Sequence, residues 1–133
     1  MDLKKLTDQY KDELLDNVLP FWLEHSQDHE YGGYFTCLDR KGNVFDTDKF
    51  IWLQGREVWL FSMLYNKVEK RQEWLDCAIQ GGEFLKKYGH DGNYNWYFSL
   101  DRSGRPLVEP YNIFSYTFAT MAFGQLSLAT GNQ

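Results

Sequence analysis

The sequence predicts a mainly α-helical fold made of helix pairs, with a short β-hairpin between the two helices of each pair. The first observation is a repeat: the segment 34–45 returns at 97–108, 63 positions later, and the copies differ by one inserted residue. The second is that each copy reads as a strand, an Asp-Arg-x-Gly turn and another strand, because its glycine can adopt a positive φ. The third is that a long, strongly apolar helical segment follows each copy.

Helices with one polar side alternate along the chain with helices that are apolar almost all round. A closed ring buries the apolar surfaces of both kinds of helix. The helices with a polar side then lie outside, and the helices that are apolar all round lie inside. Six pairs of about 63 residues give an (α/α)6 toroid of roughly 400 residues. Residues 1–133 are therefore predicted to be an incomplete toroid, the N-terminal third of a single (α/α)6 barrel domain, unless another copy supplies the missing neighbours.

A self-contained four-helix domain is the alternative, because 133 residues suffice to bury a core. The two helices without a polar face count against it.

The first outer helix is expected from Leu3 to about His25. Its apolar residues recur at intervals of three and four, which is typical of a helix with one apolar side. They are Leu3, Leu6, Tyr10, Leu14, Val18, Phe21 and Trp22. The polar, glycine-ended segment 27–33 then forms a loop into the first hairpin.

The first inner helix is expected from Lys49 to about Val68. Apolar side chains fall all the way round it, so it should be buried on most sides. Asp46, Thr47 and Asp48 offer side-chain oxygens that can cap its first turn.

The second outer helix is expected from Gln72 to about Tyr88. Its apolar residues form one stripe, and its charged residues face away from that stripe. The stripe consists of Leu75, Ala78, Ile79, Gly82 and Leu85, and the charged residues are Glu73, Asp76, Glu83, Lys86 and Lys87.

The second inner helix is expected from Ile113 to about Ala129, again apolar almost all round. Pro110 and Asn112 mark its start, because proline cannot continue a preceding helix and asparagine caps a new one. The segment 89–95 is the loop that leads into the second hairpin.

Composition limits the partners and the compartment. The formal net charge of −5 is spread along the chain, whereas a nucleic-acid partner would require a clustered basic face. No stretch is both long and apolar enough to span a membrane. Cys37 and Cys77 lack metal-site spacing, so we expect neither a structural zinc nor a disulfide framework. These features predict a cytoplasmic protein without a metal.

The segment 52–59, Trp-Leu-Gln-Gly-Arg-Glu-Val-Trp, is the candidate site. Gly55 costs a helix about 1 kcal/mol relative to alanine, so another group should approach the backbone there. Arg56 follows on a helix with little room for a solvated charge. Its guanidinium needs a ligand oxygen or a carboxylate, which Glu57 or the next helix could supply.

Two aromatic residues are candidates for sugar binding. Trp52 lies one turn before Arg56 on the same face, and aromatic rings stack on the C–H faces of sugars, although such a stripe also suits a plain core. Tyr111 stands with Asn112 at the rim formed by the N-terminal ends of the inner helices. The positive ends of those helix dipoles favour a developing anion.

The histidines and loop carboxylates are expected to play local roles. His25, His29 and His90 fall at a helix end and in loops, where a solvated or capping histidine is the simpler interpretation. Asp28 and other loop carboxylates read as turn and capping residues. No phosphate-binding loop, nucleophile elbow or zinc-protease motif is present.

Several segments together resemble the N-acylglucosamine 2-epimerase family, also called renin-binding protein. They are Gly-Tyr-Phe-Thr-Cys-Leu-Asp-Arg at 33–40, Lys-Phe-Ile-Trp-Leu-Gln-Gly-Arg at 49–56, Gly-Gly-Glu-Phe-Leu at 81–85, Gly-Arg-Pro at 104–106 and Ile-Phe-Ser at 113–115. The family fold is an (α/α)6 barrel, which agrees with the repeat.

The resemblance implies interconversion of N-acetylglucosamine and N-acetylmannosamine, so an amino sugar would be the small-molecule partner. The proton at C2 is removed, an enediolate forms, and a proton returns from the opposite face, which requires two bases. The family's two histidines come from later inner helices and have no counterpart here. Arg56 is the active-site residue that carries over, and it would hold a substrate oxygen and stabilise the enediolate.

The resemblance leaves other points open. Tyr116 stands where family members often carry an acidic residue, a substitution that could shift the preference for the sugar. No cofactor is required, ATP regulates some members, and a homodimer is compatible with the family. The alternatives are an aldose–ketose (mannose) isomerase, a cellobiose 2-epimerase, or a non-catalytic helical domain that binds sugars or proteins.

Overall fold

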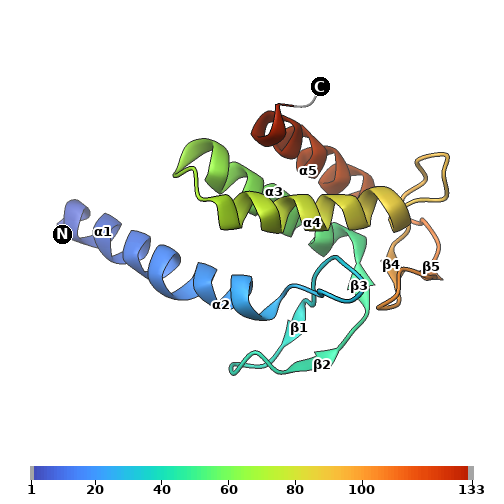
Figure 1. The fold of residues 1–133 in the computed structure, drawn as a ribbon, viewed down its shortest axis with the longest axis horizontal. Coiled ribbons are helices and arrows are strands. Elements are labelled where there is room, and N and C mark those ends of the chain that lie inside the picture. The colour runs from blue at the N-terminus through green and yellow to red at the C-terminus, as the bar shows by residue number, and fades with distance from the viewer. Residues whose placement is uncertain (1, 132–133) are drawn as a thin grey trace.

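The computed structural model describes residues 2–131, so the ends of the predicted extent 1–133 lie outside the described residues. The chain is mainly helical with short strands, as predicted, and Figure 1 shows α3, α4 and α5 packed together while α1 extends away from them. The helices are α1 (Leu3–Glu13), α2 (Leu19–His25), α3 (Ile51–Lys67), α4 (Gln72–Tyr88) and α5 (Phe114–Thr130), and a π-helical turn η1 (Leu14–Val18) joins α1 to α2. The strands are β1 (Cys37–Leu38), β2 (Val44–Asp46), β3 (Lys49–Phe50), β4 (Ser99–Leu100) and β5 (Pro106–Val108).

The first helical segment runs from Leu3 to His25 as predicted, but its middle is a π-helical turn. Pro20 explains this turn: it has no N–H to donate to the preceding turn, and the wider turn accommodates that loss. The apolar stripe of α1 has no partner within the described chain, because Leu3 and Tyr10 are about two-thirds exposed and α1 buries no residue.

Helix α3 packs against both α4 and α5. Gly55 allows the closest approach, because a Cβ at this position would lie 2.9 Å from the backbone carbonyl of Phe118 on α5. The predicted close approach at Gly55 is therefore confirmed. Helix α5 is apolar almost all round, as predicted, but among the described residues it buries only Ser115, Ala119 and Ala122.

The stripe predicted on α4 is only partly right. Ala78, Gly82 and Leu85 are buried, but Ile79 is exposed. Two large side chains that the stripe omits, Trp74 and Phe84, are almost completely buried.

Both predicted hairpins are present. β1 pairs with β2 and β4 pairs with β5, and in the turns Gly42 and Gly104 have φ values of +83° and +93°. The predicted cap of α3 is wrong. Lys49 and Phe50 form strand β3, which pairs with β4, so α3 begins after Phe50 without a side-chain cap. The start of α5 is as predicted, since the Asn112 side chain accepts a hydrogen bond from the Phe114 N–H at 3.0 Å.

Candidate functional site

A cavity of about 270 Å³ lies between the η1–α2 segment and α3. Its walls are mostly apolar, and Arg56 and Glu57 are the two ionisable residues among them. The lining residues are Leu14, Val18, Leu19, Trp22, Thr36, Leu53, Arg56, Glu57, Trp59, Leu60 and Phe61. This cavity brings the predicted arginine to an apolar, aromatic surface.

Arg56 lies over two aromatic rings. Its guanidinium carbon is 5.8 Å from the ring centroid of Trp52 and 5.7 Å from that of Phe118, and the two rings are 6.1 Å apart. Such contacts attract a cation to the ring faces. They confirm that Trp52 and Arg56 share a face, and they add Phe118, which the sequence analysis did not single out.

The expected crowding around Arg56 is wrong, because its side chain is exposed at the edge of the cavity. Within residues 2–131 it forms no ion pair, so the predicted pairing with Glu57 or with a carboxylate of the next helix is not made there. Its positive charge is therefore available to a ligand oxygen. Its catalytic role stays a prediction.

Glu57 points toward the C-terminal end of α2. The Ser26 hydroxyl oxygen lies 2.5 Å from Glu57 Oε1 and 2.6 Å from the Trp22 carbonyl oxygen. Burial raises the pKa of the Glu57 carboxyl to about 8. Glu57 is half-buried as a residue and lines the cavity next to the candidate arginine, where the sequence predicted only an ion-pair partner.

Tyr111 lies in a different group of rings. It is about two-thirds exposed, its ring centroid is 4.8 Å from that of Phe98, and Phe98 is 5.6 Å from Phe50. Because Phe50 directly precedes α3, these rings stand near the N-terminal end of α3. Its role in substrate binding stays a prediction.

His25 and His90 have the local roles that the sequence predicts. His90 Nδ1 accepts a hydrogen bond from the Gly92 N–H at 3.0 Å within its loop. His25 packs on Phe21 at 4.9 Å between ring centroids, at the last turn of α2. Neither lines the cavity that holds Arg56.

A buried ion cluster joins the first helix–hairpin–helix repeat to the second, and no pattern in the sequence predicted it. Lys49 Nζ donates to Asp28 Oδ2 at 2.9 Å and to the carbonyls of Gly32 and Arg102 at 2.6 and 2.8 Å. Arg102 donates to both oxygens of Asp28, at 3.0 and 3.1 Å. Asp28 also accepts backbone N–H bonds within its own loop, so its predicted turn role is correct but incomplete.

The pKa values in this cluster reflect its geometry. Burial acts to raise the pKa of Asp28, but the hydrogen bonds from Arg102 and Lys49 outweigh it and lower the pKa to about 2. Burial lowers the pKa of Lys49 despite its pairing with Asp28. None of the cavities among the described residues is lined by Asp28, Lys49 or Arg102, so we interpret the cluster as a structural link between the two helix–hairpin–helix repeats.

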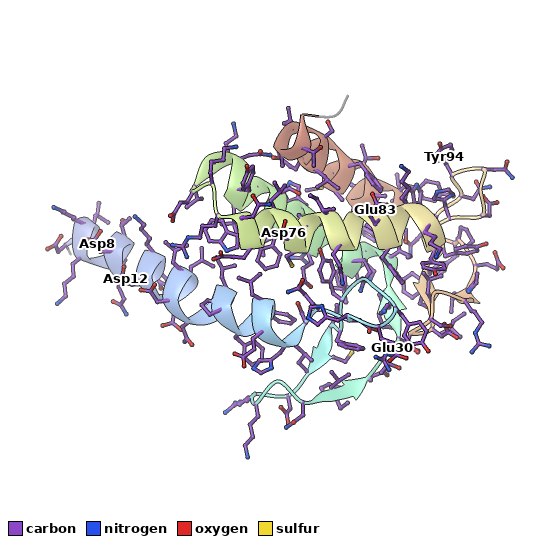
Figure 2. All side chains as sticks on the ribbon, in the orientation of Figure 1. Asp8, Asp12, Glu30, Asp76, Glu83 and Tyr94 are labelled. Atoms are coloured by element: carbon purple, nitrogen blue, oxygen red, sulfur yellow. The ribbon has the colours of Figure 1, made fainter. Side chains whose placement is uncertain are left out.

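Most acidic side chains lie away from the cavity. Figure 2 shows Asp8 and Asp12 on α1, Asp76 and Glu83 on α4, and Glu30 beside the loop before the first hairpin. None of them lines the cavity.

Across residues 2–131, no three histidine, cysteine, aspartate or glutamate side chains gather closely enough to hold a metal ion. None of the helices in this range combines the length and apolar character needed to cross a membrane.

Comparison with known proteins defines the family. The family model described as N-acylglucosamine 2-epimerase (GlcNAc 2-epimerase) matches residues 33–133. The chain therefore belongs to the N-acylglucosamine 2-epimerase family, as the motifs predicted.

Individual relatives agree with this assignment. The chain is 48% identical over 121 residues to the N-acylglucosamine 2-epimerase of Mus musculus and 47% identical to that of Homo sapiens. Each match covers 88% of this chain, but the chain spans only 29% and 28% of those relatives. The solved structure of a cellobiose 2-epimerase from Bacillus thermoamylovorans superposes with a TM-score of 0.87 at 28% identity, covering 98% of this chain and 34% of that one.

Proposed function

We propose that this chain forms part of a sugar 2-epimerase that interconverts N-acetylglucosamine and N-acetylmannosamine, and that Arg56 binds the substrate oxygen on which negative charge develops. The observation that carries the proposal is the position of Arg56. Its guanidinium has no carboxylate partner among the described residues, and it lies over Trp52 and Phe118 beside a cavity. It belongs to the segment that the family model matches.

The chemistry explains why an unpaired arginine is needed. Removal of the C2 proton from the open-chain sugar places negative charge on the enediolate oxygens, and a cation held near them stabilises the transition state more than the ground state. A guanidinium can donate two parallel hydrogen bonds to such oxygens. Trp52 and Tyr111 would offer ring faces to the sugar, and the reaction requires no cofactor.

The two bases are proposed to come from further helix pairs. The chain spans less than a third of the mouse and human relatives, which leaves room for the remaining pairs of an (α/α)6 toroid. The exposed apolar residues of α1 and α5, such as Tyr10 and Phe114, support this closure, because neighbouring pairs would cover them. In such a ring the C-terminal part would supply the acid–base pair, ATP would act as a regulator only, and a homodimer is compatible with the arrangement.

Proton NMR of the complete protein in D2O tests the proposal. With N-acetylglucosamine as substrate, the C2 proton signal should decay while signals of the manno epimer grow. Absence of C2 exchange with any N-acyl or free aldose would contradict an epimerase and favour the non-catalytic binding domain.

A second candidate is an epimerase that acts on a disaccharide. The similarity to the cellobiose 2-epimerase structure, at a TM-score of 0.87, favours it. The same NMR assay with cellobiose distinguishes the two, because exchange at C2 of the reducing glucose would then exceed exchange with the amino sugar. A ketose product would instead identify an isomerase.

A further inference from the structure

Hydrogen-bond counting at Ser26 indicates the protonation state of Glu57. The Ser26 oxygen is 2.6 Å from the Trp22 carbonyl oxygen and 2.5 Å from Glu57 Oε1, and oxygens this close require a proton between them. A serine hydroxyl has one proton to donate, and a carbonyl has none. If Ser26 donates to Trp22, the second proton belongs to the Glu57 carboxyl.

The surroundings of Glu57 favour its neutral form. The nearest ionisable groups on the packed segments are Tyr34, before β1, and Cys77, on α4, and burial raises the pKa of both, so both stay neutral near pH 7. The Tyr34 hydroxyl donates to the Cys77 carbonyl at 2.7 Å and is not free for Glu57. Helix α5 carries no charged residue. Among residues 2–131, Arg56 is the one cation that lines the cavity together with Glu57.

We propose that Glu57 is held as a carboxylic acid that donates its proton to Ser26, and that this neutral state is what leaves Arg56 without a partner and free to bind substrate. Glu57 is thus a positioning residue: it acts on the reaction through Arg56. This second part rests on the proposed function of Arg56, whereas the protonation state of Glu57 does not.

Ionisation of Glu57 would change both contacts. A carboxylate cannot donate to Ser26, and an enclosed negative charge is stabilised by a cation, which the guanidinium of Arg56 could supply because it lines the same cavity. Arg56 would then leave the rings of Trp52 and Phe118. The site would lose its free cation at alkaline pH, which makes the proton on Glu57 a control on substrate binding.

Carbon NMR of the side-chain carboxyls, in protein labelled at glutamate, tests the protonation state directly. The signal that disappears in Glu57→Gln should titrate with a midpoint near pH 8. A midpoint below pH 5 would overturn the proposal.

The Ser26→Ala variant gives the direction of the hydrogen bond. If Glu57 donates to Ser26, loss of the serine destabilises the acid and lowers the midpoint. If Ser26 donates to a carboxylate, its loss raises the midpoint, and the proposal fails. Circular dichroism of each variant shows whether the helices remain folded.

The activity of the complete enzyme tests the link to Arg56. At one pH unit above its midpoint Glu57 is about 90% ionised, so the ratio of kcat/KM at pH 9 to that at pH 7 should be about tenfold higher in Glu57→Gln than in wild type. An unchanged ratio with an NMR midpoint near 8 would overturn the role of Glu57 in positioning Arg56. An inactive wild-type enzyme would contradict the proposed function and leave the NMR result standing.

Discussion

The side-chain nitrogen of Lys49, in strand β3 just before α3, lies 2.9 Å from the carboxylate of Asp28, and neither side chain has any exposed surface. Arg102 from the next hairpin binds the same carboxylate. Three segments that are far apart in sequence thus meet at one buried charge. Removing Lys49 would leave Asp28 with Arg102 as its remaining cation and would leave the carbonyls of Gly32 and Arg102 without their buried donor, which is more costly than losing a surface pair.

The Lys49→Met variant is therefore expected to lose about 2–5 kcal/mol of unfolding free energy, because each buried acceptor left without a donor costs about 1–3 kcal/mol. Urea denaturation followed by tryptophan fluorescence measures this loss. Lys86→Met, on the exposed side of α4, is the matched control and should change stability by less than about 0.5 kcal/mol. Equal effects of the two substitutions would show that the cluster is not structurally important.

Asp28 should make the fold sensitive to acid. Its pKa is about 2 in the folded chain and 3.8 as a free side chain, so its contribution is complete above pH 3.8 and is lost as the pH falls through 2. The loss amounts to about 2 kcal/mol. Asp28→Asn should show a smaller change in unfolding free energy between pH 5 and pH 2 than wild type. Parallel curves for the two proteins would contradict this assignment.

Glu57 should have the opposite effect at neutral pH. Its pKa rises from 4.5 to about 8 on folding, so the folded state binds the proton more tightly and the unfolding free energy falls as the pH rises from 4.5 toward 8. The slope from this group is at most about 1.4 kcal/mol per pH unit. Glu57→Gln should flatten the curve in this window, and thermal melts at pH 5, 6.5 and 8 measure it. A mutant that keeps the wild-type slope would contradict the raised pKa.

Alanine substitutions at two glycines should distinguish a glycine that is packed against another helix from a glycine that has free space around it. Gly55→Ala places a methyl group 2.9 Å from the Phe118 carbonyl and should cost about 1–3 kcal/mol. Gly124→Ala, on α5, meets no atom within 4 Å and should stabilise the helix by about 0.5–1 kcal/mol. Equilibrium unfolding of both variants provides the comparison, and a neutral Gly55→Ala would show that α3 and α5 can separate without cost.

Arg56 should matter to activity far more than to stability. Because its side chain is exposed and unpaired within residues 2–131, Arg56→Ala should change the unfolding free energy by less than about 0.5 kcal/mol. In the complete enzyme the same change should lower kcat about 10²-fold or more, as for other groups that stabilise developing charge. Arg56→Lys keeps the charge but loses the planar fork, so it should recover only part of the activity. Unfolding of the alanine variant would instead indicate a structural role.

Periodicity predicted the helices well, because α3, α4 and α5 begin and end within about two residues of the expected positions. The repeat predicted both hairpins for a physical reason: a glycine at positive φ after Asp-Arg fixes a tight turn in each. Gly55 within a helix also predicted the contact with Phe118 correctly. These features are local, or they leave a local mark in the sequence.

The features that could not be predicted depend on partners far along the chain. Lys49 looked like the first residue of a helix, but it belongs to a strand whose partner is Leu100. Asp28 looked like a turn residue, since nothing near it indicates that Arg102 reaches it. Arg56 was expected to be crowded because its helix is apolar all round, yet the described chain covers only part of that helix.

The pairing of β3 with β4 also bears on how this chain folds during synthesis. Lys49 leaves the ribosome about 50 residues before Leu100, the residue that it pairs with, and Arg102 emerges later still. Until then the Lys49 ammonium group can bind Asp28 and Gly32, but it lacks the carbonyl of Arg102. We expect nascent chains arrested before the second hairpin to be cleaved readily by proteases, and chains arrested beyond it to resist.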